Sequence, residues 1–253
     1  MSQPPASRES FLPEIQIDGP GPQRRWTVLV RLILLIPHFL VVYFVGIAAA
    51  VVAVLGWFAA LFTTRLPSWI SDFLVLYVGY RARVNAYYYL LTDSYPPFLT
   101  TAVGDPVRAD VRPGQLNRAT VFFRIILVIP AAVLASVVAS GWGALSFFLW
   151  LTVLITGRVP QSLFGASAAV VRFLFRVQAY FVLLTDAYPK GLFGDGQQED
   201  ATGTRPLLLS RGARVLLIVF LVLGILALIG SITAQAFYQP DFEYYEYDSA
   251  LPF

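Results

Sequence analysis

Long apolar stretches alternate with short polar segments along this chain. Residues 31–65 and 124–158 form long, almost unbroken apolar runs, each bounded by arginine at both ends. Residues 68–91 and 161–184 form second apolar runs that carry arginines near their middle, and a last apolar run covers 214–234. Runs of about 20 apolar residues predict helices that can cross a bilayer. The pattern therefore predicts an all-α integral membrane protein with two tandem helical repeats and a C-terminal transmembrane helix.

The two repeats are copies of one another. A shift of 93 residues, which places Arg31 on Arg124 (124 − 31 = 93), aligns the chain with itself without a gap. The segment RVNAYYYLLTDSYPPF at 83–98 recurs as RVQAYFVLLTDAYPKG at 176–191. Chance does not give so many identities in register, so one segment of the chain was duplicated. We expect the copies to pack as a pseudo-twofold pair with their first helices in contact.

A short polar segment precedes each repeat, EIQIDGPG in the first copy and VRADVRPG in the second. Apolar and polar residues alternate in both, and each ends at a Pro-Gly turn, which predicts short β-like lead-ins. The predicted parts of the chain are an N-terminal polar segment at 1–25, membrane repeat 1 at 26–98, a polar connector at 99–118, membrane repeat 2 at 119–191, a linker at 192–213, a C-terminal transmembrane helix at 214–236 and an acidic aromatic tail at 237–253.

The first helix of each repeat is too long for one membrane crossing. Residues 31–65 give about 50 Å of helix at about 1.5 Å per residue, whereas a crossing takes about 20 residues. A proline inside a helix removes a backbone hydrogen bond and kinks the helix. We therefore expect Pro37 and Pro130 to divide each helix into a short interfacial lead-in and a span. The predicted spans are 38–62 and 131–155.

The second helix of each repeat leaves two arrangements open. An arginine at the centre of a span costs about 2.5–3.5 kcal/mol, and a position at the membrane interface avoids that cost. The arginines concerned are Arg81, Arg83, Arg172 and Arg176. However, interfacial helices would put the two copies on opposite sides of the membrane and leave many arginines outside, against the positive-inside tendency. We favour five embedded helices, with the N-terminus in the cytoplasm and the C-terminus outside.

Composition narrows the classes of function. Hydrophobic residues make up 57% of the chain and charged residues 13%, whereas a soluble domain has about 25% charged residues. The 18 Lys and Arg residues are dispersed, which argues against binding of nucleic acid. Cysteine is absent, so no disulfide or thiolate chemistry is expected. The polar N-terminal segment leads into an apolar run that is too long for a signal peptide, which predicts an uncleaved signal anchor.

Motifs of catalysis are not found in the sequence. It contains no G-x-S-x-G, P-loop or H-E-x-x-H motif, and we expect no enzyme, no cofactor, and no catalytic or metal-binding residues. The single histidine, His38, follows Pro37, and we interpret it as a polar residue at a helix kink rather than a proton relay. Glycines inside the apolar runs are expected to mark close helix packing. These glycines are Gly46, Gly56, Gly79, Gly141, Gly143 and Gly165.

Matched arginines inside the apolar runs are the best candidates for contact with lipid or partners. Arg83 and Arg176 need either a lipid phosphate or a carboxylate, because an unpaired charge in an apolar helix is costly. Asp93 and Asp186 are the candidate carboxylates, each from the other repeat, since ten residues span about 15 Å of one helix. The simpler alternative is a helix-exit motif that duplication copied. The tail offers further candidate contacts at Tyr244, Tyr245 and Tyr247.

The segments RLILLIPHF, WFAALFTTRLP and RVNAYYYLLTDSYPPF, together with their second copies, resemble the DUF4389 family of bacterial membrane proteins of unknown function. The resemblance covers about 26–98 and 119–190. The second copy departs from the first at Ala131, which replaces His38, and at YPKG, which replaces YPPF. The resemblance implies a tandem domain in the bacterial plasma (inner) membrane, and it supplies no catalytic residues.

The sequence therefore favours a non-catalytic membrane protein. We expect an accessory or scaffolding subunit that binds the lipid bilayer and other membrane proteins, because its apolar surfaces are rich in aromatic residues and glycine. A small transporter or channel subunit is the alternative, since tandem repeats often build one.

Overall fold

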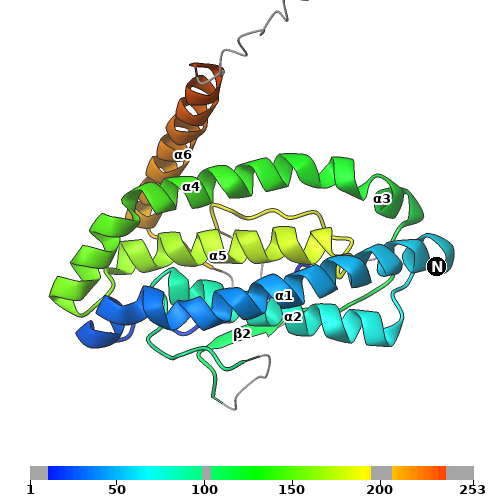
Figure 1. Ribbon diagram of the computed structural model, residues 1–253, viewed down its shortest axis with the longest axis horizontal. Coiled ribbons are helices and arrows are strands. Elements are labelled where there is room, and N and C mark those ends of the chain that lie inside the picture. The colour runs from blue at the N-terminus through cyan, green and yellow to red at the C-terminus, as the bar shows by residue number, and fades with distance from the viewer. Residues whose placement is uncertain (1–10, 99–103, 195–206, 238–253) are drawn as a thin grey trace, which may run out of the picture.

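The fold is mostly helical (Figure 1). The computed structural model describes residues 11–98, 104–194 and 207–237. Both predicted lead-ins contain a strand, at the start of EIQIDGPG and of VRADVRPG. The elements in chain order are β1 (Glu14–Ile17), α1 (Arg25–Thr63), α2 (Ser68–Tyr88), β2 (Val107–Asp110), α3 (Arg118–Phe122), α4 (Arg124–Thr156), α5 (Gln161–Phe181) and α6 (Arg211–Phe237).

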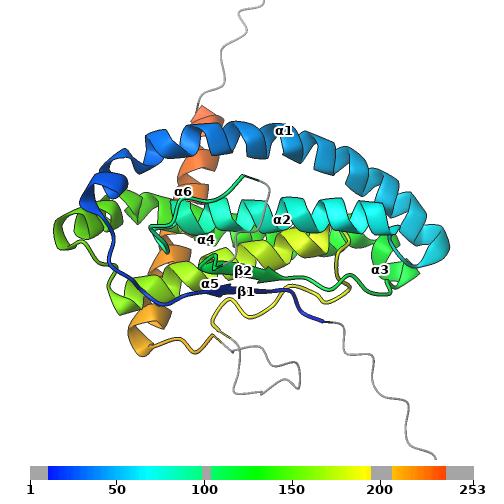
Figure 2. The same cartoon turned by 90° about the horizontal axis from the view of Figure 1, so that it is seen from below.

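The long apolar helices α1 and α4 keep most of their surface exposed. α1 buries one stripe that includes Leu35, Ala49 and Ala60, and its other apolar side chains face outward. α1 continues through Pro37 without a break and curves along its length (Figure 2), so the division expected at this residue is not a break in the helix. α4 likewise continues through Pro130. A proline removes one hydrogen bond, and packing against the second helix of the repeat holds the turns on either side together.

The shorter helices α2 and α5 form the interior. They contact each other, and each packs beneath the long helix of its own repeat. Leu74 and Val78 of α2 and Ala166 and Val170 of α5 have no exposed surface. Among the described residues, the helices long and apolar enough to cross a membrane are three, namely α1, α4 and α6. α2 and α5, the other two helices expected to be embedded, do not meet this criterion and pack largely against protein.

An approximate two-fold axis relates the repeats. Strands β1 and β2 pair antiparallel, with Glu14 opposite Asp110 and Ile17 opposite Val107. The 93-residue shift converts the first pair into the second (14 + 93 = 107 and 110 − 93 = 17), so the axis passes through the centre of the sheet. Contacts between α2 and α5 and between α1 and α4 continue the relation through the bundle. The predicted pseudo-twofold pair, with its long helices in contact, is confirmed.

The long helices run antiparallel, and each is fastened to the beginning of the other repeat (Figure 1). The indole nitrogen of Trp57, near the end of α1, donates to the carbonyl oxygen of Val121 at 2.8 Å. The indole of Trp150, near the end of α4, donates to the carbonyl oxygen of Val28 at 2.8 Å. These bonds exchange under the two-fold axis, so they close the pair symmetrically.

The two TD-x-YP turns consequently lie at opposite ends of the bundle. Asp93 accepts a hydrogen bond from Thr27 at the start of α1, and Asp186 accepts one from Thr120 just before α4. If α1 and α4 crossed a membrane, these turns would face different compartments. Five crossing helices with both turns on the cytoplasmic side, as the sequence favours, are therefore not compatible with an upright antiparallel bundle.

α6 has no counterpart in the repeats and leaves the bundle at a steep angle (Figure 1). It crosses α4 where glycines allow the two backbones to touch. A methyl group added at Gly141 would overlap the carbonyl of Phe220, and one added at Gly224 would overlap the carbonyl of Val137. The prediction that glycines mark helix packing is thus confirmed at Gly141, whereas nothing lies within 4 Å of a Cβ atom added at Gly143.

Two alanine substitutions separate these glycines. Gly141→Ala should force α6 away from α4 and lower stability by about 1–3 kcal/mol, as overpacking does. Gly143→Ala should leave stability unchanged or raise it by up to about 1 kcal/mol, because alanine favours the helix. Denaturant titration in mixed micelles measures both. Equal effects of the two substitutions would contradict the crossing.

The pairing of β1 with β2 can be trapped by a disulfide, since the natural chain has no cysteine. Gln16 and Arg108 are directly opposite, at a separation of about 5.5 Å between Cα atoms that a disulfide bridges. We expect Gln16→Cys with Arg108→Cys to cross-link on mild oxidation. With a protease site inserted at 99–103, the two fragments should then stay together until they are reduced. Gln16→Cys with Gly114→Cys is the control and should separate.

Candidate functional site

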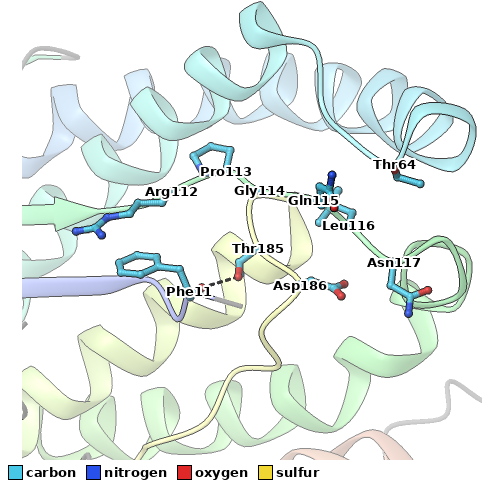
Figure 3. Close-up of a pocket in the computed structure, with 10 residues that line it drawn as sticks. All are labelled: Phe11, Thr64, Arg112, Pro113, Gly114, Gln115, Leu116, Asn117, Thr185 and Asp186. Atoms are coloured by element: carbon cyan, nitrogen blue, oxygen red, sulfur yellow. Dashed lines mark hydrogen bonds between the residues drawn. The ribbon is translucent and has the colours of Figure 1, made fainter. Parts of the chain in front are cut away.

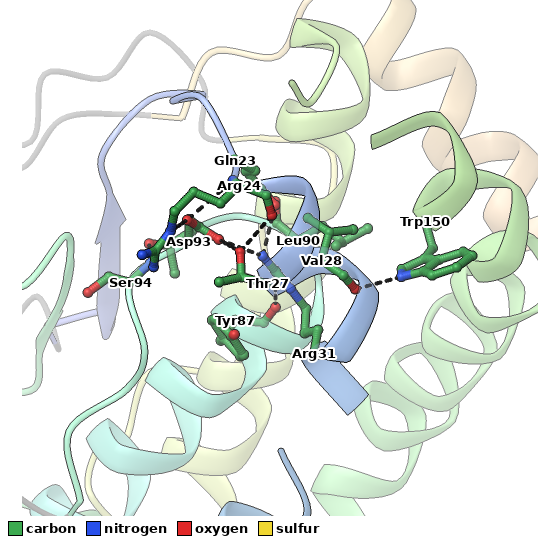
Figure 4. A network of polar contacts seen from close by, with 11 residues as sticks. Gln23, Arg24, Thr27, Val28, Arg31, Tyr87, Leu90, Asp93, Ser94 and Trp150 are labelled. Carbon is green, nitrogen blue, oxygen red and sulfur yellow. Dashed lines mark hydrogen bonds and ion pairs between the residues drawn. The ribbon is translucent and has the colours of Figure 1, made fainter. Parts of the chain in front are cut away.

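A buried arginine organises the polar centre of repeat 1 (Figure 4). Arg31, on α1, has 2% of its side chain exposed. Its guanidinium donates to the carbonyl oxygen of Tyr87 at 2.6 Å and to the side-chain oxygen of Gln23 at 2.8 Å, and it lies 4.3 Å above the Tyr87 ring. A carboxylate oxygen of Asp93 is 3.5 Å away. Arg31 therefore joins the start of α1 to the end of α2.

The carboxylate of Asp93 is shared between several donors. Arg24 approaches it at 2.8 Å, and the hydroxyl of Thr27 donates to its second oxygen. Just before it, Leu90 adopts a left-handed backbone with φ of 63°, and its carbonyl accepts from the amide of Gln23 at 2.5 Å. A left-handed conformation is uncommon for leucine and persists only where surrounding contacts impose it. The polar cluster thus fixes the chain as it leaves α2.

The same arrangement recurs in repeat 2. Arg124 donates to the carbonyl oxygens of Tyr180 and Thr185 at 2.5 and 2.8 Å, and it lies 4.1 Å above the Tyr180 ring. Its ion pair with Asp186 is 3.2 Å long, and Leu183 repeats the left-handed backbone with φ of 68°. The duplicated segment is therefore a clamp on each helix exit, which agrees with the simpler interpretation of the sequence.

The expected pairing of Arg83 with Asp186 is wrong. Arg83 is 3.7 Å from the carboxylate of Asp105, which lies in the connector ahead of β2. Burial lowers the pKa of Arg83, and the charge of Asp105 opposes this effect. The reason is geometric: the antiparallel packing sets the lead-in of the other repeat against the middle of α2, whereas the TD-x-YP turns lie at helix ends.

Arg176 is held in the corresponding way, but by backbone. It donates to the carbonyl oxygen of Pro13 at 3.1 Å and to that of Lys190 at 2.8 Å. Arg83 and Arg176 are 4% and 1% exposed, so both belong to the interior. The tail residues proposed for partner contact, Tyr244, Tyr245 and Tyr247, lie outside the described residues.

His38 is fully buried, as an aromatic neighbour rather than a surface group. Its Nδ1 is 2.6 Å from the hydroxyl of Tyr80, and its ring stacks on Phe98 at 4.3 Å. In repeat 2 the positions of His38 and Tyr80 are occupied by Ala131 and Phe173, so this bonded pair occurs in repeat 1 and not at the equivalent positions of repeat 2. No group of three or more metal-ligating side chains occurs within the described residues.

One cavity, of about 770 Å³, lies beside the repeat 2 turn (Figure 3). Most of its polar side chains already have partners. Arg112 pairs with Asp110 at 2.7 Å and lies 4.5 Å above the Phe11 ring, and Thr185 donates to the Phe11 carbonyl. Asp186 is held by the clamp described above. This cavity therefore offers few unsatisfied groups to a ligand.

A second cavity, of about 820 Å³, is a groove between the repeats, and we call it the axial groove. It is lined by residues of α1, α2, α4 and α5. Equivalent positions of the two copies both contribute to its lining, which places the groove between the two halves that the two-fold axis relates. The matched lining pairs are Phe39 with Ala132, Arg81 with Leu174, Asn85 with Gln178, and Tyr88 with Phe181.

The polar side chains of the axial groove have few partners. The closest bond of the exposed Arg81 is to the hydroxyl of Tyr77 at 3.4 Å, and no described carboxylate lies within ion-pairing distance of it. The amides of Asn85 and Gln178 make no side-chain hydrogen bond to any described residue. From the sequence, Arg81 was interpreted only as a residue that raises the free energy of inserting its helix into a membrane. Its replacement by Leu174 in the second copy was the signal that it serves something other than the shared clamp.

Two segments, 25–100 and 118–192, match the family model described as Domain of unknown function (DUF4389). Together they cover more than half of the chain and coincide with the two repeats. No curated protein and no solved structure matches the chain.

The clamp makes a quantitative prediction. Arg124→Leu leaves Asp186 and two carbonyls without their donor, and it should cost about 3–5 kcal/mol of unfolding free energy, as the loss of one member of a buried ion pair does. Arg158→Leu, at an exposed arginine, should change it by less than about 0.5 kcal/mol. Adding Asp186→Asn to Arg124→Leu should restore part of the loss. Denaturant titration in mixed micelles decides, and equal effects of the two arginine substitutions would refute the clamp.

Proposed function

The chain belongs to the DUF4389 family through two tandem copies of its domain, and we propose that it is a non-catalytic scaffold that lies along one leaflet of a membrane. In this arrangement α1 and α4 are immersed in lipid, the β1–β2 sheet faces water, and α6 crosses the bilayer as an anchor. The observation that carries the proposal is the separation of apolar long helices from a polar sheet, with α2 and α5 between them (Figure 2).

The length of the bundle supports this orientation. α1 has 39 residues, which is about 58 Å of helix, whereas the hydrocarbon core is about 30 Å thick. A bundle of this length would extend well beyond the core if it stood upright. Lying in the plane, both long helices present their apolar surfaces to acyl chains. Exposed side chains on these surfaces include Ile33, Ile36, Leu40 and Phe44 of α1, and Ile126, Val133, Phe147 and Phe148 of α4.

The sheet supports the same orientation. Arg108 and Asp18 form an ion pair at 2.9 Å with 64% and 60% of their side chains exposed. The sheet is centred on the two-fold axis, so in an upright bundle this pair would lie near the membrane midplane. Irregular polar backbone at that depth is tolerated only where protein or water covers it. In the plane of the membrane, the pair is simply solvated.

The interior polar groups support a structural role. The arginine clamps and the lead-in contacts bind helix ends and strands to each other, and they hold a rigid apolar surface in place. α6 adds exposed apolar residues, among them Ile218, Val222 and Ile225, that suit lipid or the helix of another membrane protein.

A small transporter is the second candidate. An upright bundle would make the antiparallel copies an inverted repeat, which is the symmetry of many transporters. The two proposals place the ends of the bundle differently, so topology separates them.

Labelling of single cysteines tests the orientation in the cysteine-free chain. Gly21 and Gly114 are matched, exposed positions near the starts of α1 and α4, where an added side chain meets nothing within 4 Å. For an in-plane bundle, we expect an impermeant maleimide to label Gly21→Cys and Gly114→Cys from the same side in oriented membranes. Labelling from opposite sides would overturn the proposal and favour the transporter. Isolation in native-lipid discs then tests scaffolding, which predicts a stoichiometric protein partner or an enriched lipid.

A further inference from the structure

The axial groove carries matched amides but charge from one repeat only. Asn85 of α2 and Gln178 of α5 are matched positions that both line it, whereas the counterpart of Arg81 is the apolar Leu174. On α2 the groove-lining residues at 81, 85 and 88 share one face, because positions four and three apart on a helix are neighbours. The opposite face carries Arg83 toward the sheet. Of the two arginines of α2, Arg83 therefore has an ion pair within the fold, whereas Arg81 has none with any described residue.

The positive charge of Arg81 would be stabilised by a bound anion. The groove opens between the two apolar helices that we place in lipid, and an arginine in such a setting is costly unless it is paired. Each ion pair among the described residues joins a carboxylate to an arginine other than Arg81. A guanidinium suits the oxygens of a phosphate, to which it donates two hydrogen bonds at once. The amides of Asn85 and Gln178 are positioned on the same lining to donate to the remaining oxygens.

Apart from the hydroxyl groups of Tyr88, Tyr89 and Ser136, the rest of the lining is apolar. Leu32 and Phe39 of α1 and Val128 and Ala135 of α4 form the two long walls, and Phe181 contributes from α5. A volume of about 820 Å³ is within the range of ligand-binding cavities, about 300–1,000 Å³. Walls of this kind bury acyl chains and would gain little from a free inorganic ion.

We propose that the axial groove binds the phosphate of an acidic phospholipid through Arg81, Asn85 and Gln178, with the acyl chains along its apolar walls. The proposal rests on the orientation argued above, in which the groove opens toward one leaflet. It gives the scaffold a specific lipid, held between its two halves.

Binding can be measured on the full chain after removal of lipid in detergent. The readouts are native mass spectrometry and the shift of thermal unfolding on addition of phosphatidylglycerol, phosphatidylcholine or inorganic phosphate. We expect phosphatidylglycerol to bind tightest and inorganic phosphate to have little effect. Arg81→Gln should weaken phosphatidylglycerol binding by about tenfold or more, the effect of losing a charged hydrogen bond. Arg158→Gln, at an exposed arginine outside the groove, should bind like the natural chain.

A second variant, which should bind more tightly, distinguishes a loss of binding from a loss of folding. Leu174→Arg adds the missing second cation at the symmetric position and should tighten phosphatidylglycerol binding. Equal binding of the two phospholipids, or retention of the preference in Arg81→Gln, would overturn the groove proposal. Binding of inorganic phosphate as tight as that of lipid would replace the lipid by a soluble anion. These results are independent of the labelling of Gly21→Cys and Gly114→Cys, so failure of the groove and failure of the in-plane orientation are distinguishable.

Discussion

A guanidinium buried in an apolar bundle needs hydrogen-bond acceptors, and the rest of this structure depends on the ones that Arg31 and Arg124 find. Each takes the last carbonyls of the following helix, the face of a tyrosine ring and a nearby aspartate. The charge thereby turns the exit of one helix into the anchor for the start of another. Because this happens at matched positions, the two repeats have equivalent rigid ends, and those ends supply the carbonyls that Trp57 and Trp150 bind across the axis.

With these charges held inside, the outer surface of the two long helices can be almost entirely apolar. α1 and α4 bury only a narrow stripe each, and their remaining surface is available to lipid. α2 and α5 have the opposite character, since more than half of their residues are buried and they carry the buried arginines Arg83, Arg172 and Arg176. In each repeat, the long helix provides apolar surface and the shorter helix provides the interior. This difference explains why a chain with such apolar long helices also contains a two-stranded sheet with exposed ion pairs.

The sequence was sufficient for the repeat, the helices, both strands and the pairing of the two copies, because these follow from periodicity and from an internal match. It was insufficient for the direction of packing. A shift that places Trp57 on Trp150 establishes equivalence, but parallel and antiparallel copies obey the same shift. The assignment of Asp186 to Arg83 failed for that reason, since an antiparallel pair brings Asp105 to the helix middle instead. The continuity of α1 through Pro37 also escaped, because tertiary packing offsets the loss of one backbone bond. The sequence distinguishes Arg81 from Arg83 only by its counterpart, Leu174 instead of Arg176, and the structure adds that Arg81 lines the groove between the repeats.

The antiparallel strand pair has an ancestral implication. Its register is self-complementary: if both strands were β1, Glu14 of one chain would face Ile17 of the other, because position 110 corresponds to 17 and position 107 to 14. The tryptophan bonds and the helix contacts obey the same exchange. A single-copy protein thus has in itself every contact needed to close this architecture as a homodimer. Fusion of two copies of the gene would then have allowed the two halves to change independently. The equivalent groove residues Arg81 and Leu174 are such a difference, because the subunits of a homodimer have the same residue at each position.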